Sequence, residues 1–264
     1  MLKSRNLRTC RAIVAAWALC LISAPTEPIR AVEETSRSKE PFAISTVQVT
    51  TGTLLDKWLA VEREIEAESL TLKICEENRA SCSSQAALEF LAIIDSGRFS
   101  DGRARLGEVN RAINLKIKSM SDLALYGVED FWSSPLATFA TGAGDCEDYA
   151  IAKFVALQEA GVSAGDLRIL VMRDELRKED HAVVAARLNE SWLLLDNLHM
   201  MMVEDHHVRD YYRPKFLLDR DGVKRYLGAS ATSEGPCADA RWEGFGVCWI
   251  IPFGRRGIGG NDHS

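Results

Sequence analysis

Three residues of this sequence have the types and spacing that nucleophilic catalysis needs, and the first is a cysteine. Cys146 stands in the segment GAGDCEDYAIAKF, where a glycine-containing loop passes into a run with helical character. At the first turn of a helix, a thiol meets free N–H groups and about half a positive charge, and both stabilise a thiolate. The same N–H groups can stabilise a developing oxyanion. Cys146 is therefore the candidate nucleophile.

The candidate base and its partner stand further along the chain. His181 opens one apolar segment, and Asp196 ends the next, LLLDN. If residues 181–187 and 192–196 pair as an antiparallel hairpin, the start of the first strand lies beside the end of the second. Asp196 could then orient the His181 ring, and His181 could take the proton of the thiol. Each residue alone has an ordinary structural explanation, but their joint occurrence favours a triad.

Three carboxylates flank the cysteine: Asp145, Glu147 and Asp148. Negative charge this close disfavours a thiolate. One explanation is structural, because the helix dipole favours acidic residues in a first turn. The other is a hard cation, since closely spaced carboxylate oxygens suit Ca²⁺.

The remaining polar and aromatic candidates carry no predicted chemistry. His206 and His207 are expected in a solvated turn. Trp132, Trp192 and Trp242 are expected in the core or in the wall of a cleft. Zinc is not expected, because no cysteine pair has C-x-x-C spacing.

The N-terminus has the pattern of a secretory signal. Lys3, Arg5, Arg8 and Arg11 precede an apolar run over residues 12–24, which is too short to span a bilayer of roughly 30 Å. We therefore expect a signal peptide over residues 1–31 and a periplasmic protein, with retention as an uncleaved anchor as the alternative. Residues 32–49 are polar and are expected to form a flexible lead-in.

The other cysteines suit an oxidising compartment. Two close pairs, Cys75 with Cys82 and Cys237 with Cys248, are predicted to form disulfides that close short loops. Cys146 is then left alone as a free thiol.

Hydrophobic periodicity predicts the elements that position these residues. Helices are expected from about 53, from 84, over 106–117 and over 146–160, and strands over 167–172, 181–187 and 192–195. Residues 119–144 are expected to be irregular, because glycine and proline interrupt them. The order predicts an α+β fold, with N-terminal helices and the nucleophile-bearing helix packed on an antiparallel sheet. A domain over residues 50–253 and a flexible tail over 254–264 complete the expected organisation.

Composition limits the functional classes. The chain of 264 residues is 47% hydrophobic, which is enough for a packed domain, and its formal net charge is −6. A nucleic-acid partner is not expected, because it would require a basic face.

The motifs GDCEDYA, HAVV and LLLDN, with the upstream stretches VNRAIN and YGVEDFWSSP, resemble the bacterial transglutaminase-like cysteine proteinases. Within that family they are most similar to the LapG-type periplasmic adhesin proteases. The resemblance covers roughly residues 50–205 and implies a papain-like, transglutaminase-like fold. It also implies that Cys146, His181 and Asp196 are the triad, and that Asp145 and Glu147 bind calcium.

The leading hypothesis is therefore an exported cysteine endopeptidase. The resemblance implies a protein substrate such as a large surface adhesin, a role in biofilm attachment, and a membrane-bound inhibitory receptor as a partner. An acyl transferase of the transglutaminase type is the second hypothesis, because the same thioester can be resolved by an amine. A disulfide-stabilised binding module without activity is the third.

Overall fold

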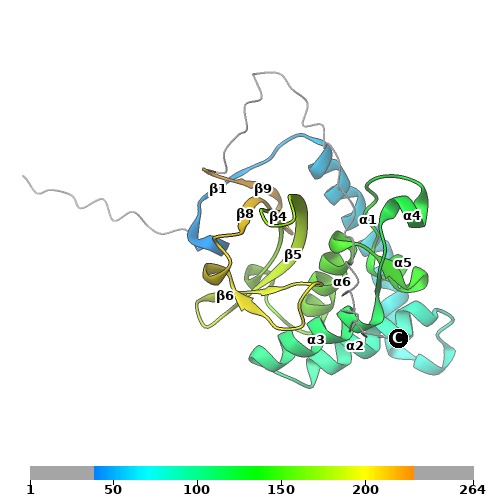
Figure 1. Ribbon diagram of the computed structural model, residues 1–264. Helices are drawn as coiled ribbons and strands as arrows, with labels where there is room; N and C mark the ends of the chain where they lie inside the picture. Colours follow the sequence, from blue (N-terminus) through cyan, green and yellow to red (C-terminus); the bar gives the residue numbers. More distant parts are fainter. Residues whose placement is uncertain (1–38, 229–264) are drawn as a thin grey trace, which may run out of the picture. The chain divides into compact units, whose positions relative to one another are not determined.

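The computed structural model describes residues 39–228, which form an α+β domain. Its helices lie together on one side of a sheet (Figure 1). The helices are α1 (Thr53–Glu77), α2 (Gln85–Arg98), α3 (Gly102–Lys116), α4 (Asp122–Tyr126), α5 (Pro135–Thr141) and α6 (Cys146–Glu159). Four 3-10 turns accompany them: η1 (Pro41–Ala43), η2 (Arg79–Ser81), η3 (Ala164–Asp166) and η4 (Asp205–His207).

The main sheet is antiparallel throughout, in the order β1-β9-β8-β4-β5-β6-β7. Its strands are β1 (Thr46–Gln48), β4 (Leu167–Asp174), β5 (Glu179–Leu188), β6 (Ser191–Leu195), β7 (Val203–Glu204), β8 (Tyr212–Asp219) and β9 (Gly222–Tyr226). Two short strands, β2 (Lys118–Ser119) and β3 (Ala143–Gly144), pair in parallel beside the start of α6.

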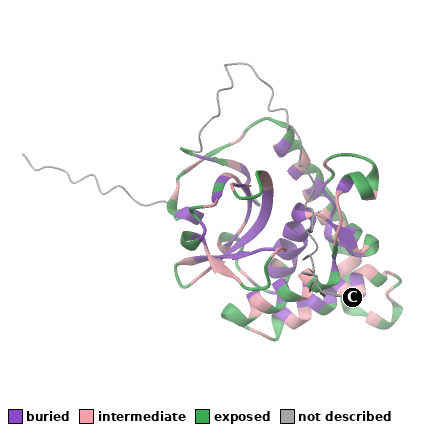
Figure 2. Ribbon diagram, in the orientation of Figure 1, coloured by how far each residue is buried: buried purple, intermediate pink, exposed green. Residues whose placement is uncertain are grey.

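Side chains alternate between the two faces of the sheet, and each face has its own core. Ile169, Val184 and Leu195 pack against the helices, whereas Leu170, Val183 and Leu194 pack on the opposite face against η1 and η4. Helix α6 runs through the helix-side core and is buried along most of its length (Figure 2). The helix that carries Cys146 is thus held from all sides, which favours a fixed position for the thiol.

Local sequence signals account for the helices that position the site. Helix α1 begins at Thr53, as predicted, and Ser84 caps α2 with its side chain accepting a hydrogen bond from Ala87 N at 3.2 Å. Helix α6 begins at Cys146, also as predicted. It ends before Gly161, whose φ of 93° lies in the left-handed region that glycine adopts without strain.

The hairpin between β5 and β6 confirms the predicted register at the heart of the sheet. Leu188 pairs with Ser191, and Val184 pairs with Leu195. Asn189 and Glu190 form the two-residue turn with φ of 49° and 69°, the left-handed values that such tight hairpins require. The end of β6 therefore lies beside the middle of β5, and the residues that follow β6 lie beside the first residues of β5.

Two expectations from the sequence need correction. Residues 39–49 of the predicted flexible lead-in belong to the fold, because Phe42 is buried and Thr46 pairs with Tyr226 at the sheet edge. Residues 119–144 are not irregular throughout, since they contain α4, α5 and strand β3. The predicted signal peptide, residues 32–38 of the lead-in and the tail over 254–264 lie outside the described residues.

Cys75 and Cys82 form a disulfide at the end of α1, as predicted. Among residues 39–228, Cys146 is the cysteine that forms no disulfide, and it is buried. The predicted pair Cys237–Cys248 lies outside the described residues. No helix in the described part of the chain is long and apolar enough to cross a membrane.

Candidate active site

Cys146 is the first residue of α6 and has only 2% of its surface exposed. Asp145 is the N-cap of this helix, and the Asp148 side chain folds back to accept a hydrogen bond from Asp145 N at 3.3 Å. Gly144 permits this arrangement, because a Cβ at that position would overlap the Asp148 carboxylate. Gly144 thus leaves the space that the Asp148 side chain needs to cap the start of α6.

His181 and Asp196 form a direct hydrogen bond. His181 Nε2 lies 2.9 Å from Asp196 Oδ1, and both side chains are buried. An ionised carboxylate only accepts hydrogen bonds, so Nε2 donates. The hairpin register explains the contact, because His181 is near the start of β5 and Asp196 follows the last residue of β6.

The Asp196 carboxylate is also held by two other donors. Leu198 N donates to Oδ1 at 2.9 Å, and Tyr212 OH donates to Oδ2 at 3.1 Å. Burial opposes the charged form of Asp196, but the charge and hydrogen bond of His181, the Leu198 amide and Lys153 outweigh it. Together they lower the pKa of Asp196 below its usual range. Asp196 is therefore a carboxylate that can orient the His181 ring.

Helix α6 brings Cys146 to the same end of the sheet. The helix packs on β4 and β5, and Lys153 of α6 donates from Nζ to Leu195 O at 3.3 Å. Side chains on a helix lean toward its N-terminus, so the first turns of α6 lie next to the end of β6. The three residues predicted for the triad are thus carried by elements that meet at one end of the sheet.

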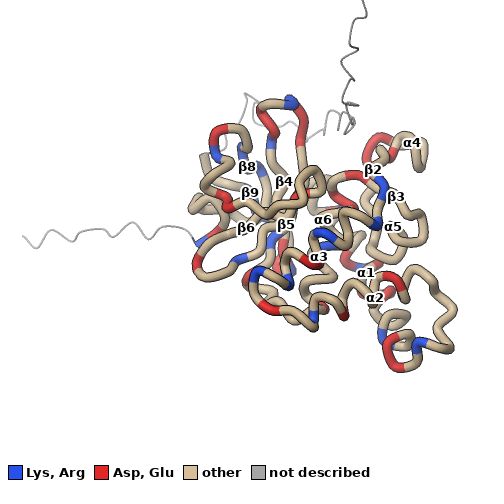
Figure 3. Tube along the Cα trace, turned by 60° about the horizontal axis from the view of Figure 1, so that its bottom comes forward, with Lys and Arg blue, Asp and Glu red and all other residues tan. Residues whose placement is uncertain are grey.

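Five acidic residues surround the start of α6, more than the local sequence suggested. Besides Asp145, Glu147 and Asp148, the cluster includes Asp122 at the start of α4 and Asp130 in the loop that follows. Figure 3 shows acidic residues beside α4 and near β2 and β3. Carboxylate oxygens of Asp122, Asp145 and Asp148 lie within 4.8 Å of one another, as do those of Asp122, Asp130 and Glu147.

This acidic cluster is buried or half-buried, and only part of its carboxylate oxygens accept hydrogen bonds. Ser133 N donates to Asp148 Oδ1 at 2.8 Å, and Lys57 pairs with Asp130. Four of the five carboxylates each have one oxygen that receives no hydrogen bond within the described residues: Asp122 Oδ1, Asp130 Oδ1, Asp145 Oδ1 and Glu147 Oε1. Buried carboxylate oxygens without donors fit a hard cation, which ligates through oxygen.

Burial also makes these carboxylates resist ionisation. Burial, which outweighs the hydrogen bond from the Phe131 amide, acts together with the neighbouring charges of Glu147 and Asp130 and raises the pKa of Asp122 to about 7. Burial likewise raises the pKa of Asp145, Glu147 and Asp148. The Cys146 thiol donates to Glu147 Oε2 at 3.1 Å, so the acidic cluster and the candidate nucleophile are in direct contact. Positive charge is needed here if these groups are to ionise together.

Sequence reasoning missed Asp122, Asp130, Tyr212 and Lys153. Asp122 and Asp130 reach the cluster only through long-range packing, and no spacing rule links them to Cys146. Tyr212 is the first residue of β8, a strand for which the sequence pattern gave no prediction. Lys153 has a helical position that usually indicates a solvated side chain, but the structure buries it.

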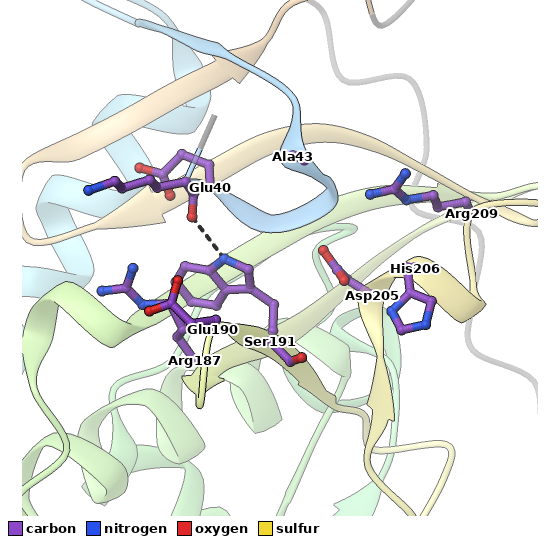
Figure 4. A pocket seen from close by; sticks show the side chains of 10 residues that line it. Glu40, Ala43, Arg187, Glu190, Ser191, Asp205, His206 and Arg209 are labelled. Atoms are coloured by element: carbon purple, nitrogen blue, oxygen red, sulfur yellow. Dashed lines mark hydrogen bonds between the residues drawn. The ribbon is translucent and has the colours of Figure 1, made fainter. Parts of the chain in front are cut away.

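The predicted histidine turn lies away from these residues, beside a separate cavity. His206 and His207 are in η4, with ring centroids 3.9 Å apart, and both are exposed. A cavity of about 430 Å³ lies between Arg187 and Glu190 on one side and His206 and Arg209 on the other (Figure 4). Trp192 lines this cavity and Trp132 is buried, as expected of core or cleft-wall residues, whereas Trp242 lies outside the described residues.

A buried cysteine at a helix start, packed on an antiparallel sheet that carries a His–Asp pair, is the arrangement expected of a transglutaminase-like cysteine peptidase. The comparison with protein families agrees. The description "bacterial transglutaminase-like cysteine proteinase" matches residues 67–214, more than half of the chain, and the protein belongs to this family. It is accordingly a cysteine peptidase.

Solved structures show the same fold. Legionella pneumophila LapG in its calcium-bound form is 24% identical, with a TM-score of 0.50 over 62% of this chain and 93% of that chain. The EGTA-treated form of that protein is also 24% identical, with a TM-score of 0.50 over 64% of this chain and 87% of that one. Comparison with curated proteins gives no match.

Proposed function

We propose that this protein is an exported endopeptidase that cleaves a protein chain through a thioester on Cys146. The observation that carries the proposal is the buried His181–Asp196 hydrogen bond at 2.9 Å, at the end of the sheet that the start of α6 reaches. A histidine held in this way has one ring nitrogen fixed by a carboxylate. Its other nitrogen, Nδ1, is then the atom that exchanges protons with a thiol.

In the first half of the reaction, His181 Nδ1 takes the proton of Cys146 and the thiolate attacks the scissile carbonyl carbon. The oxyanion that forms is stabilised by N–H groups at the start of α6, which have no intrahelical partner. The C–N bond then breaks, and His181 returns the proton to the leaving amine. Asp196 stabilises the imidazolium and keeps the ring oriented throughout.

In the second half, water attacks the thioester while His181 accepts one of its protons. The C–S bond breaks, the new carboxyl group leaves, and the proton returns to the Cys146 sulfur. An amine in place of water would give acyl transfer, but no observation in the described residues favours that acceptor.

Calcium is the cofactor that we propose for the acidic cluster. Asp145 and Glu147 would each offer a carboxylate oxygen to the ion beside Asp122, Asp145 in a group with Asp148 and Glu147 in a group with Asp130. The calcium-bound LapG structure supports the choice of ion by similarity. Bound there, Ca²⁺ supplies positive charge that offsets the carboxylates beside the Cys146 thiol.

The substrate we propose is a large surface or periplasmic protein such as an adhesin, so that cleavage would release the cell from a surface and control biofilm attachment. The similarity to LapG-type proteases and the signal-like residues 1–31 support a periplasmic location and this class of substrate. A membrane-bound receptor that restrains the peptidase belongs to the same proposal.

The proposal is tested by comparing the surface and secreted proteins of cells that carry the wild-type enzyme with those of cells that carry Cys146→Ala. New N-termini that depend on Cys146 identify the substrate and the scissile bond. Identical sets of N-termini, with the two proteins present at equal levels, would contradict an endopeptidase of exported proteins. Cross-linked products in place of paired fragments would favour acyl transfer.

A further inference from the structure

Lys153 is a fully buried lysine that the proposed reaction does not use. It lies in α6, two helical turns after Cys146, with 1% of its surface exposed. Its Nζ donates to Leu195 O at 3.3 Å and lies 5.8 Å from the centroid of the Tyr149 ring. Among the described residues, no carboxylate lies within the 4.0 Å of an ion pair with Nζ.

Burying a lysine ammonium costs desolvation free energy, and the fold alone does not require a lysine at this position. An ammonium has three donors, and here one of them has a hydrogen-bond acceptor among the described residues. Burial lowers the pKa of Lys153 to about 7, and the charge of Asp196 opposes this shift. An apolar side chain of similar length would fill the space between α6 and the sheet without that cost.

The acceptor of the Lys153 hydrogen bond, Leu195 O, lies next to the residue that holds His181. Leu195 is the last residue of β6, and the next residue, Asp196, binds His181. From the other side, Asn114 of α3 donates from Nδ2 to Asp196 O at 2.8 Å. The backbone that carries the Asp196 carboxylate is therefore held by polar side chains from two helices.

We propose that Lys153 is a positioning residue of the peptidase, which ties the helix that carries Cys146 to the strand end that carries Asp196. The inference rests on the proposed function, because it assigns Lys153 the task of holding the thiol and the His181–Asp196 pair at their working separation. It acts through Leu195 and Asp196 and does not contact the substrate.

Lys153→Met is the first test, since methionine keeps most of the length and removes the donors and the charge. The matched control is Leu157→Ala, which opens a cavity in the apolar core one turn later in the same helix. For Lys153→Met we expect kcat to fall about tenfold with little change in KM, because a small displacement of catalytic groups acts on the chemical step. Its thermal midpoint should not fall. Leu157→Ala should lower the midpoint and keep kcat.

Two measurements separate these cases. One is steady-state kinetics on the protein that Cys146-dependent N-termini identify as the substrate, and the other is thermal unfolding of each variant. Wild-type kcat in folded Lys153→Met overturns the inference, as does an equal loss of kcat in Leu157→Ala, which would show that any loosening of α6 has the same effect. If the methionine variant does not fold, Lys153→Gln replaces it under the same criteria.

A second readout does not depend on turnover. In the Cys146→Ala background, nuclear magnetic resonance follows the His181 ring proton that is shared with Asp196. We expect Lys153→Met to shift this proton and to speed its exchange with water, and an unchanged signal overturns the inference. Activity that survives in Cys146→Ala alone contradicts the proposed function instead, so the two failures are distinguishable.

Discussion

The Nε2 atom of His181 lies 2.9 Å from Oδ1 of Asp196, and both side chains are buried at the end of one β-hairpin. The contact fixes the tautomer of the ring, because the carboxylate accepts the Nε2 proton and leaves Nδ1 as the basic nitrogen. Leu198 and Tyr212 hold the carboxylate in turn. A histidine restrained in this way suits the role of base that we propose for it.

His181→Ala should lower kcat about 10⁴-fold, since the base acts in both halves of the reaction. Asp196→Ala should cost less, about 10²-fold, because the aspartate orients and stabilises the ring but exchanges no proton with the substrate. Steady-state kinetics with circular dichroism as the folding control will measure both. Wild-type rates in a well-folded His181→Ala variant would remove this residue from the mechanism.

Removal of calcium should abolish most of the activity. With a chelator present, the carboxylates around Cys146 oppose thiolate formation, and added Ca²⁺ should restore cleavage where equal Mg²⁺ does not. Mg²⁺ demands tighter octahedral geometry and gives up its water reluctantly. Asp145→Ala and Glu147→Ala should behave like the chelated enzyme.

The control for these variants is Asp56→Ala, which removes an exposed acid from the first turn of α1 and should keep full activity. Calorimetry on metal-stripped protein checks binding directly. Full activity in chelator, with no heat of binding, would contradict the calcium site. The acidic residues would then only stabilise the start of the helix, and the proposed triad would be unaffected.

The metal-stripped protein should lose stability as the pH rises. Because burial raises the pKa of Asp122 to about 7, the folded state binds a proton that the unfolded state releases at about 3.9. The stabilising contribution is therefore complete below about pH 4 and is lost as the pH rises through about 7. Asp196 has a lowered pKa and is ionised throughout this window, so it adds no slope.

Thermal midpoints measured in chelator from pH 5 to pH 8 will check this prediction. The midpoint should fall with pH in the wild type, and the fall should be smaller in Asp122→Asn, which cannot ionise. Parallel curves for the two proteins would show that Asp122 ionises normally in the folded state.

The local sequence was sufficient where one residue or one turn decides the structure. The helix start at Cys146, the glycine stop at Gly161 and the turn at Asn189 and Glu190 all follow from backbone preferences that act within a few residues. The pairing of His181 with Asp196 then follows from the hairpin register. The contact between these two residues was predictable for this reason.

The acidic cluster and the buried lysine depend on packing between distant segments. Asp122 comes to Asp145 and Glu147 because α4 and its loop fold over the start of α6, and short helices interrupted by glycine give a weak periodic signal. A lysine within a helix is usually solvated, so the local sequence predicts an exposed Lys153. The residue is buried because α6 packs on the sheet and Nζ bonds Leu195 O at the end of β6. Residues 39–49 were predicted to be flexible because a three-residue edge strand such as β1 is too short to show the alternation of apolar and polar residues.

The most direct test of the account is the covalent intermediate on Cys146. The purified enzyme is mixed with its substrate protein, quenched in acid within one turnover, and digested for mass spectrometry. We predict a thioester that joins the newly formed C-terminus of the substrate to Cys146, which is lost on treatment with hydroxylamine and absent in His181→Ala. Cleavage at the wild-type rate by Cys146→Ala, or an acyl group on another residue, would contradict the account.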